Sequence, residues 1–195
     1  MSRYSESDPF LDAATGVLIN RFGITDERTL EQTEALVAIS SYELSQTPLK
    51  RHFDLAHLQA IHKHLFGDLY EWAGKLRTID ISKGANRFAN HLQIESAAAP
   101  IFLQLAKENH LAGLGAEPFS DRAAYYLGEL NALHPFREGN GRAQREFISH
   151  LAHANGYYIA WENMVPADLL AATIASFHDD TSGVAGFIRP NLKRS

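Results

Sequence analysis

The chain has 195 residues, 45% of them hydrophobic and 21% charged, which is the balance of an ordinary folded protein rather than a disordered one. Its formal net charge is −5 with ten neutral histidines, so the overall charge favours neither nucleic acid nor an anionic membrane as a direct partner. There is no cysteine, which excludes disulfides and thiolate-based metal sites. No stretch is long and apolar enough to cross a bilayer, and the N-terminal MSRYSESDPF has no apolar signal-peptide core.

Hydrophobic periodicity and end signals predict helices over most of the chain. We expect them at residues 29–44, 55–74, 94–108, 121–133, 142–154, 166–177 and 184–188. Asp54 and Ser120 are expected as N-caps, Gly74 as a stop signal and Pro166 as a first-turn residue. Pro100 is expected to kink or split the third helix, because proline lacks the N–H that an interior position donates.

One stretch has the alternation of a strand. Residues 76–81 (LRTIDI) alternate, SKGAN follows as a turn, and RFANHL could return as a second strand. We therefore expect a mainly α fold, a helical bundle with a small β-hairpin flap at about 76–92. No repeat or linker is found, so the chain is expected to form a single domain, residues 1–195.

The sequence HPFREGNGR, residues 134–142, gathers groups that could do chemistry in one short loop. The loop lies between two predicted helices, so Gly139, Asn140 and Gly141 stand at a helix N-terminus. Free backbone N–H groups and the helix dipole favour an anion there, and glycine lets a phosphate approach closely.

Charged side chains accompany this cradle. Arg142 and Arg145 lie three residues apart and could both reach a di- or triphosphate. Glu138 would be repelled by phosphate unless a cation bridges them, and Mg²⁺ is the natural choice. His134 carries an imidazole, which suits a general base acting on a hydroxyl. Phe136 is expected to be buried and to anchor the loop.

Each of these features has a plainer interpretation when it is taken alone. A histidine before a proline is usually a loop residue, Gly-Asn-Gly is usually a turn, and arginines on a first helical turn are often solvated. Their combination in one loop instead favours phosphoryl or nucleotidyl transfer by positioning and charge stabilisation. The loop is not a P-loop, because no Gly-Lys-Ser/Thr follows the glycines.

At these residues the sequence resembles the Fic family, whose signature is His-Pro-Phe-x-Asp/Glu-Gly-Asn-Gly-Arg, usually with a second arginine three residues on. Here it reads HPFREGNGRAQR without a departure. The likeness extends to YEWAGKLRTIDISKG at 70–84, to Phe88-Ala89, and to DPFLDAATGVLINRFGI at 8–24, which resembles the opening of small bacterial Fic toxins. The resemblance implies the Fic fold, with its active site on a central helix–loop–helix.

The implied activity is transfer of AMP from ATP to a Ser, Thr or Tyr hydroxyl of a target protein, with release of pyrophosphate. His134 would be the catalytic base, and Glu138 would hold Mg²⁺ between the α- and β-phosphates. Arg142 and Arg145 would bind the β/γ end of ATP, Phe136 would anchor the loop in the core, and the anion hole would be formed by Gly139, Asn140 and Gly141.

The flap would hold the target backbone as an added strand, which sets register without reading much sequence. The docking residues implied are Ile81, Ser82, Lys83 and Gly84. Lys83 could touch the target side chain, and a solvated turn lysine is an equally good interpretation.

Gly141 bears on the reaction type. The related Doc-like toxins have lysine at this position and transfer a phosphate, whereas glycine leaves the cradle open and favours nucleotidyl transfer. Relatives that use UTP or CDP-choline keep much of the loop, so a phosphotransferase, another nucleotidyltransferase and a catalytically idle effector or binding module stay as alternatives.

Many Fic proteins carry an inhibitory helix with the pattern Ser/Thr-x-x-x-Glu-Gly/Asn. Glutamates followed by Gly or Asn occur here at Glu108, Glu138 and Glu162, and none has Ser or Thr four residues earlier. The chain therefore resembles the class restrained by a separate small helical antitoxin, and we expect such a partner to supply a glutamate to Arg145.

The resemblance further implies a toxin of a toxin–antitoxin pair in the bacterial cytoplasm, with delivery into a host cell as an effector left open. Relatives in this class modify the ATPase subunits of type II topoisomerases at a tyrosine, and no residue of the chain specifies that target.

Overall fold

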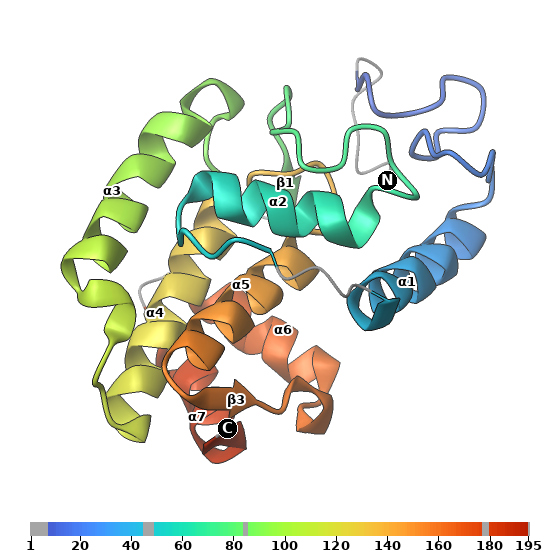
Figure 1. Ribbon diagram of the computed structural model, residues 1–195. Helices are drawn as coiled ribbons and strands as arrows, with labels where there is room; N and C mark the ends of the chain where they lie inside the picture. Colours follow the sequence, from blue (N-terminus) through green and yellow to red (C-terminus); the bar gives the residue numbers. More distant parts are fainter. Residues whose placement is uncertain (1–7, 45–48, 84–85, 177–179, 195) are drawn as a thin grey trace.

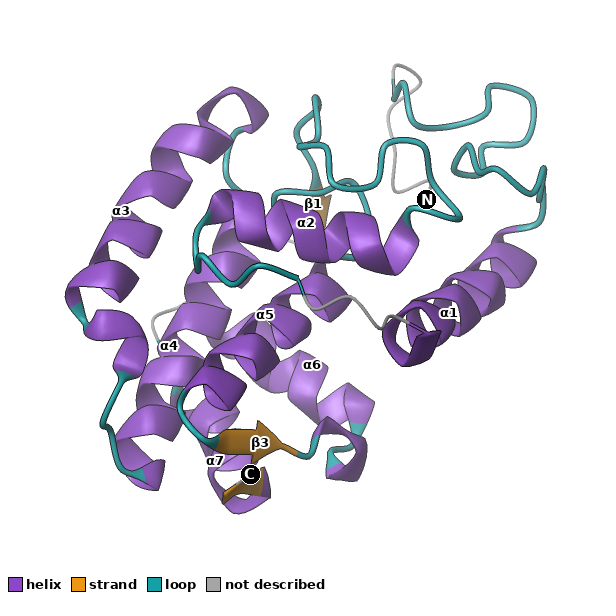
Figure 2. Cartoon of the chain, viewed as in Figure 1, coloured by secondary structure: helices purple, strands orange, loops and turns teal. Residues whose placement is uncertain are grey.

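The computed structural model describes residues 8–44, 49–83, 86–176 and 180–194, with only the backbone described at 38–44, 83 and 86 (Figure 1). The chain is mainly α, as predicted, and Figure 2 shows helices over most of its length. The helices are α1 (Glu27–Leu44), α2 (Leu55–Phe66), α3 (Ile94–Lys107), α4 (Ala116–Leu133), α5 (Asn140–Ala154), α6 (Pro166–Ala175) and α7 (Ser182–Asn191). Short 3₁₀ turns lie at η1 (His91–Gln93), η2 (Asn109–Leu111) and η3 (Trp161–Asn163). Among these described residues, no helix has both the length and the apolar character needed to span a bilayer.

The helices pack around α4 and α5, which lie at the centre of the molecule (Figure 1). α4 packs against α7 and α5, and α2 bridges α5 and α1. The apolar stripe of α2 is buried in this core, with Leu58 and Ile61 fully covered. Burial of such stripes, rather than helix propensity, supplies most of the stability of helices of this length.

Several predicted helix boundaries are wrong. The helix that begins after Asp54 stops at Phe66 and not at Gly74. Asp54 does cap it, because its Oδ1 accepts from the His57 N–H at 2.8 Å. Gly67 donates its N–H to the Lys63 carbonyl, and residues 68–74 continue as turns.

The fourth helix begins four residues before the position at which Ser120 was expected to cap it. α4 starts at Ala116, and Ser120 is a buried interior residue whose hydroxyl donates to the Ala116 carbonyl at 2.8 Å. Pro100 does not split α3, which runs unbroken from Ile94 to Lys107. Pro100 lies on the exposed side of α3, where water can satisfy the carbonyl that it leaves without an N–H donor.

The flap is a hairpin, but its strands lie later than predicted. β1 (Ser82–Lys83) pairs antiparallel with β2 (Asn86–Arg87), and residues 76–81 form no strand. Buried Arg77 bends this segment, because its guanidinium donates to the carbonyls of Ile79, Ala89 and His134. A second antiparallel pair, β3 (Tyr157–Ile159) with β4 (Leu192–Arg194), was not predicted as a sheet.

Candidate active site

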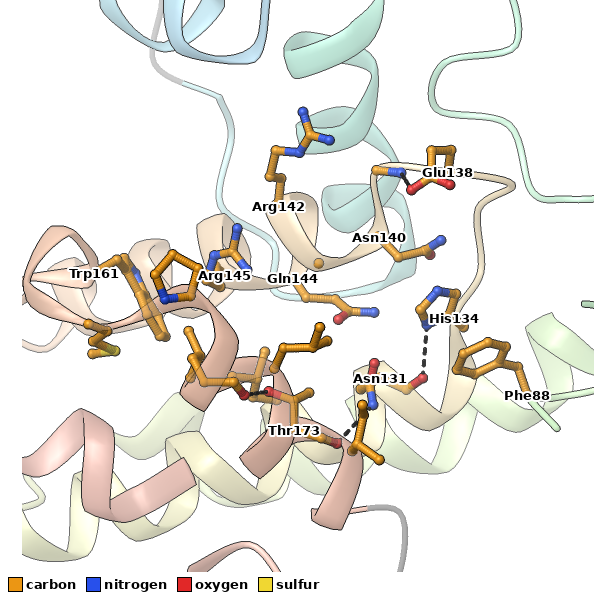
Figure 3. A pocket seen from close by; sticks show the side chains of 18 of the residues that line it. Phe88, Asn131, His134, Glu138, Asn140, Arg142, Gln144, Arg145, Trp161 and Thr173 are labelled. Carbon is orange, nitrogen blue, oxygen red and sulfur yellow. Dashed lines mark hydrogen bonds between the residues drawn. The ribbon is translucent and has the colours of Figure 1, made fainter. Parts of the chain in front are cut away.

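The loop between α4 and α5 opens into a cavity of about 530 Å³, which we call the main cavity (Figure 3). It brings together all the residues predicted to act on phosphate or on a hydroxyl: His134, Glu138, Gly139, Asn140, Gly141, Arg142 and Arg145. We call this part of the lining the polar end. The candidate residues of the loop therefore line the same cavity, so they could act together on one bound ligand.

His134 is held at the C-terminus of α4 in a conformation that is rare for a non-glycine residue. Its φ is 45° and its ψ is 61°, and its N–H still donates to the Leu130 carbonyl. The ring Nδ1 lies 3.2 Å from the Asn131 carbonyl oxygen. A carbonyl only accepts, so Nδ1 carries the proton and Nε2 carries the basic lone pair. The Phe88 ring from the flap stacks on the imidazole at 3.7 Å between centroids, which fixes the plane of the ring.

Asn140 holds the loop from inside. Its side-chain oxygen accepts from the Phe136 N–H at 2.9 Å, and its Nδ2 donates to the Phe136 carbonyl at 2.8 Å. Both residues are buried, and the Phe136 ring is fully covered. The amide side chain therefore contributes to loop shape, and the part of Asn140 turned to an anion would be its backbone N–H.

His62, on α2, forms a hydrogen bond with the backbone of Glu138. The sequence did not identify it as part of the site. Its Nδ1 accepts from the Gly74 N–H at 2.9 Å, so Nε2 carries the proton and donates to the Glu138 carbonyl at 2.9 Å. Its ring also stacks on Phe136 at 3.9 Å. Burial lowers the pKa of His62 to about 4, so the ring is neutral at physiological pH and can keep this donor–acceptor pattern.

Gly139 is the N-cap residue of α5 and has a positive φ of 77°. A Cβ at this position would lie 2.5 Å from Cε2 of Phe66, so neither the backbone conformation nor the space suits a larger residue. The turn presents the first amides of α5, which have no intrahelical carbonyl partner, to the main cavity. Gly141 has room around it, since its nearest neighbour to an added Cβ is Arg145 Nη1 at 3.6 Å.

The arginines of α5 differ in their partners. Arg142 forms an ion pair with Glu34 of α1, although its side chain also lines the main cavity. Arg145 lines the same cavity, and no carboxylate in the described part of the chain pairs with it. Burial, and then the charge of Arg142, lower the pKa of Arg145, which indicates that its charge is poorly compensated.

The other part of the main cavity, which we call the apolar end, is formed by η3, the residues that follow it, α6, and Leu127 of α4. Its side chains are mostly apolar, and they are Leu127, Trp161, Met164, Pro166, Leu169, Leu170 and Ile174, with Thr173 and Glu162 beside them. Figure 3 shows Trp161 across the cavity from His134, with Gln144 and Arg145 between them. The sequence did not predict the apolar end, because an apolar surface that binds by shape does not require polar residues at a fixed spacing. Tyr157 and Tyr158 of β3 do not line this cavity.

The root of the flap is tied to the loop by Arg77. Its Nε donates to the His134 carbonyl at 2.8 Å, and its own N–H donates to the Pro135 carbonyl. Across the root, Asp80 accepts from the N–H of His91, and the Ala89 N–H donates to Ala132 on α4. These bonds join the base to the flap root. A buried arginine that donates to backbone carbonyls and lies 3.8 Å from an Asp80 carboxylate oxygen could not be identified by spacing.

Of the residues expected to dock a target, Ser82 lies in β1 and Ile81 directly precedes it. The backbone of Lys83 completes β1, whereas its side chain and Gly84 fall outside the described residues. The paired strand β2 is followed directly by Phe88, whose ring stacks on His134.

The chain is similar to known proteins over most of its length. The family model described as the Fic/DOC family matches residues 52–152. The protein adenylyltransferase VbhT of Bartonella schoenbuchensis is 50% identical over 194 residues, which are 98% of this chain and 41% of VbhT. The chain thus spans about two fifths of the length of that relative. The probable protein adenylyltransferase y4lH of Sinorhizobium fredii is 40% identical over 97% of this chain and 98% of its own.

Among solved structures, the BepC protein of Bartonella tribocorum with bound AMPPNP superposes with a TM-score of 0.89 at 25% identity, covering 95% of this chain and 97% of the BepC chain. The predicted fold is therefore confirmed, and so is the resemblance stated from the loop. With a family model over more than half of its length and relatives at 40–50% identity over nearly all of it, this chain belongs to the Fic/DOC family.

Proposed function

We propose that this chain is a protein adenylyltransferase, which transfers AMP from ATP to a Ser, Thr or Tyr hydroxyl of a target protein and releases pyrophosphate. The observation that carries the proposal is the polar end itself. A basic imidazole nitrogen, a carboxylate and a helix N-terminus with arginines line one cavity of about 530 Å³, the size of a small-molecule site. The relatives named as protein adenylyltransferases support an enzyme of this class.

His134 acts as the general base. Its Nε2 takes the proton of the target hydroxyl as the hydroxyl oxygen attacks the α-phosphorus, and the bond from that phosphorus to the α–β bridging oxygen breaks. Pyrophosphate leaves with the bond's electron pair, and AMP stays on the target oxygen. The Asn131 carbonyl keeps the proton on Nδ1, so the ring accepts at Nε2 throughout.

Glu138 fits a magnesium ligand. Its carboxylate lines the polar end beside a helix N-terminus, where a bound polyphosphate would otherwise repel it. Mg²⁺ needs only one or two protein carboxylates when phosphate oxygens and water complete its shell. When bound, the ion would neutralise charge on the phosphates, while the amides of Gly139, Asn140 and Gly141 orient them.

The apolar end is suited to a purine base. Trp161 and Ile174 offer flat and branched apolar surface, and Asn131 and Gln144 offer amide groups at its edge. Gly141 supports nucleotidyl transfer rather than phosphate transfer, because a longer side chain would enter the space beside Arg145. A target segment would add to the flap as a strand at Ser82, so that its hydroxyl residue reaches His134 past Phe88.

The restraint on this activity would come from a second chain. Arg145 has no carboxylate partner in the described part of the chain, and the inhibitory sequence pattern is absent from the whole of it. A small helical antitoxin that supplies a glutamate to Arg145 would occupy the γ-phosphate position. The chain would then be a bacterial toxin, acting in the cytoplasm or delivered to a host cell, and type II topoisomerase ATPase subunits are candidate targets.

A labelling experiment tests the activity. The chain is incubated with bacterial lysate, Mg²⁺ and ATP labelled at the α- or the γ-phosphate, beside a His134→Ala variant. A His153→Ala variant is the matched control, since His153 is an exposed histidine at the far end of α5. Protein label from α only, lost in His134→Ala and kept in His153→Ala, is expected. Label from γ would indicate a phosphotransferase, and no label with ATP, UTP or CDP-choline would indicate a binding module.

A further inference from the structure

A second cavity lies against the loop and is walled by α1. It measures about 270 Å³ and shares Glu138 and Arg142 with the main cavity. Three glutamates of α1 line it, namely Glu27, Glu31 and Glu34. α1 lies outside residues 52–152, which match the family model, so a helix beyond that match brings carboxylates to the phosphate-binding loop.

Glu34 is the buried member of this set, with 4% of its surface exposed. One of its carboxylate oxygens accepts from Nη2 of Arg142, and the other accepts from the Tyr70 hydroxyl at 2.7 Å. Tyr70 is itself buried, and its ring stacks on Trp72 at 4.2 Å between centroids. Both oxygens of Glu34 are therefore held, and the carboxylate has one fixed direction toward Arg142.

The Arg142 guanidinium is held on one side only. Its Cζ lies 5.1 Å from the centre of the Phe66 ring, and Nη2 is taken by Glu34. Its Nη1 is buried and has no acceptor in the described part of the chain. A buried N–H without an acceptor is costly, and an incoming anion would remove that cost. Because the guanidinium is planar and rigid, fixing Nη2 also fixes the direction of Nη1.

We propose that Glu34 is a positioning residue, which holds Arg142 so that its unpaired Nη1 meets the terminal phosphates of the bound nucleotide. The inference rests on the proposed function, in which Arg142 contacts the β/γ end of ATP. It differs from inhibition by a glutamate at Arg145, because the carboxylate acts on another arginine, belongs to the same chain and leaves a donor available.

A competing role for the pair would be restraint, with Glu34 drawing Arg142 away from the phosphates. Arg142 remains among the residues that line the main cavity while it is paired, which positioning requires. Burial raises the pKa of Glu34 and the Arg142 charge opposes this, so the pair compensates a carboxylate that would be costly alone. The sign of the Glu34→Gln effect on ATP affinity separates the two roles.

The test measures dissociation constants of Mg-ATP and of AMP by calorimetry, in the full chain carrying His134→Ala so that no turnover occurs. Glu34→Gln keeps the side-chain size and an oxygen for Tyr70, and removes the charge that Arg142 contacts. We expect it to weaken Mg-ATP about tenfold and to leave AMP unchanged. Glu31→Gln is the matched control, one turn earlier on α1 in the same cavity but exposed, and is expected to change neither.

A double-mutant cycle with Arg142→Ala identifies the route of the effect. If Glu34 acts through Arg142, Glu34→Gln adds no further loss of ATP affinity in the Arg142→Ala chain. Arg142→Lys replaces Arg142→Ala if the latter melts at a markedly lower temperature. Full additivity, unchanged ATP affinity in Glu34→Gln, or tighter ATP binding would overturn the inference and leave the proposed function intact. Unchanged ATP affinity in the Arg142 variants would instead remove the phosphate role of Arg142, and with it both proposals about this residue.

Discussion

The polar end and the apolar end of the main cavity are built by different means. At the polar end, three groups are held by buried contacts: Asn140 by Phe136, the Glu138 carbonyl by His62, and the His134 carbonyl by Arg77. At the apolar end, Leu170 and Ile174 keep 47% and 41% of their surface exposed. Proton transfer and phosphate binding need fixed directions, whereas a flat base needs only apolar surface of the right shape. Groups with fixed directions therefore lie at the end of the cavity where we propose that proton transfer and phosphate binding occur.

The largest effect is expected from Gly139→Ala, because Gly139 is the residue of the polar end with the least space for a side chain. An added Cβ meets both an unfavourable φ of +77° and the Phe66 ring at 2.5 Å. We expect the free energy of unfolding to fall by about 3 kcal/mol and AMP transfer to be lost. Gly156→Ala is the control, with a φ of +72° and nothing within 4 Å, and is expected to cost about 1 kcal/mol in urea denaturation. Equal costs for the two variants would mean that Phe66 does not restrict the loop.

The Arg145→Ala variant is expected to affect the binding of ATP and of AMP differently. We propose that Arg145 binds the terminal phosphates, so its removal is expected to cost about 2 kcal/mol in Mg-ATP binding, which corresponds to roughly thirtyfold weaker binding. AMP lacks those phosphates, so its affinity is expected to stay the same. Calorimetry with both nucleotides checks this, and an equal loss for ATP and AMP would place Arg145 at the α-phosphate instead.

Low pH is expected to lower the free energy of unfolding through protonation of His62. The pKa of His62 falls from about 6.5 in the unfolded chain to about 4 when it is buried, so the unfolded state binds the proton more readily. Stability is therefore lost as the pH falls from about 6.5 toward 4, by about 2 kcal/mol between pH 7 and pH 5. His57, with a pKa lowered to about 4 by burial and by His150, adds to the same window.

Urea denaturation at pH 7 and pH 5 measures this dependence in the wild-type chain and in His62→Gln. The variant is expected to be less stable at pH 7 and to lose less on acidification. His153→Gln, at an exposed position, should follow the wild-type chain. A variant His62→Gln with the full wild-type loss would assign the acid sensitivity to other groups.

The smallest effect is expected at the apolar end. Ile174→Ala removes apolar surface at the rim of the cavity, and we expect ATP and AMP to bind about 1 kcal/mol, or roughly fivefold, more weakly. The loss should be the same for both nucleotides, in contrast to Arg145→Ala. Leu103→Ala is the control, because Leu103 is 56% exposed on α3 and does not line the cavity. A larger loss for ATP than for AMP would show that the two ends are coupled.

Local signals were sufficient where one segment decides its own structure. Asp54 caps α2 and Pro166 begins α6, because each acts on the backbone within its own first turn. The prediction of Ser120 as an N-cap was wrong, because a serine hydroxyl inside a helix can also donate to a carbonyl one turn earlier. The prediction of a strand at residues 76–81 was wrong. The side chain of buried Arg77 donates hydrogen bonds to the Ile79 and Ala89 carbonyls, which a partner strand would otherwise satisfy.

By itself, the sequence determined the helical class, the loop at 134–142 and the family, because a signature that must place a base, a carboxylate and an anion cradle within one turn of chain is readable as spacing. Only the tertiary structure decided which distant groups support that loop. Glu34 meets Arg142 across 108 positions of sequence, and His62 meets Glu138 across 76. Such contacts depend on how α1 and α2 pack on α5, and packing is chosen by the whole buried surface rather than by any local pattern.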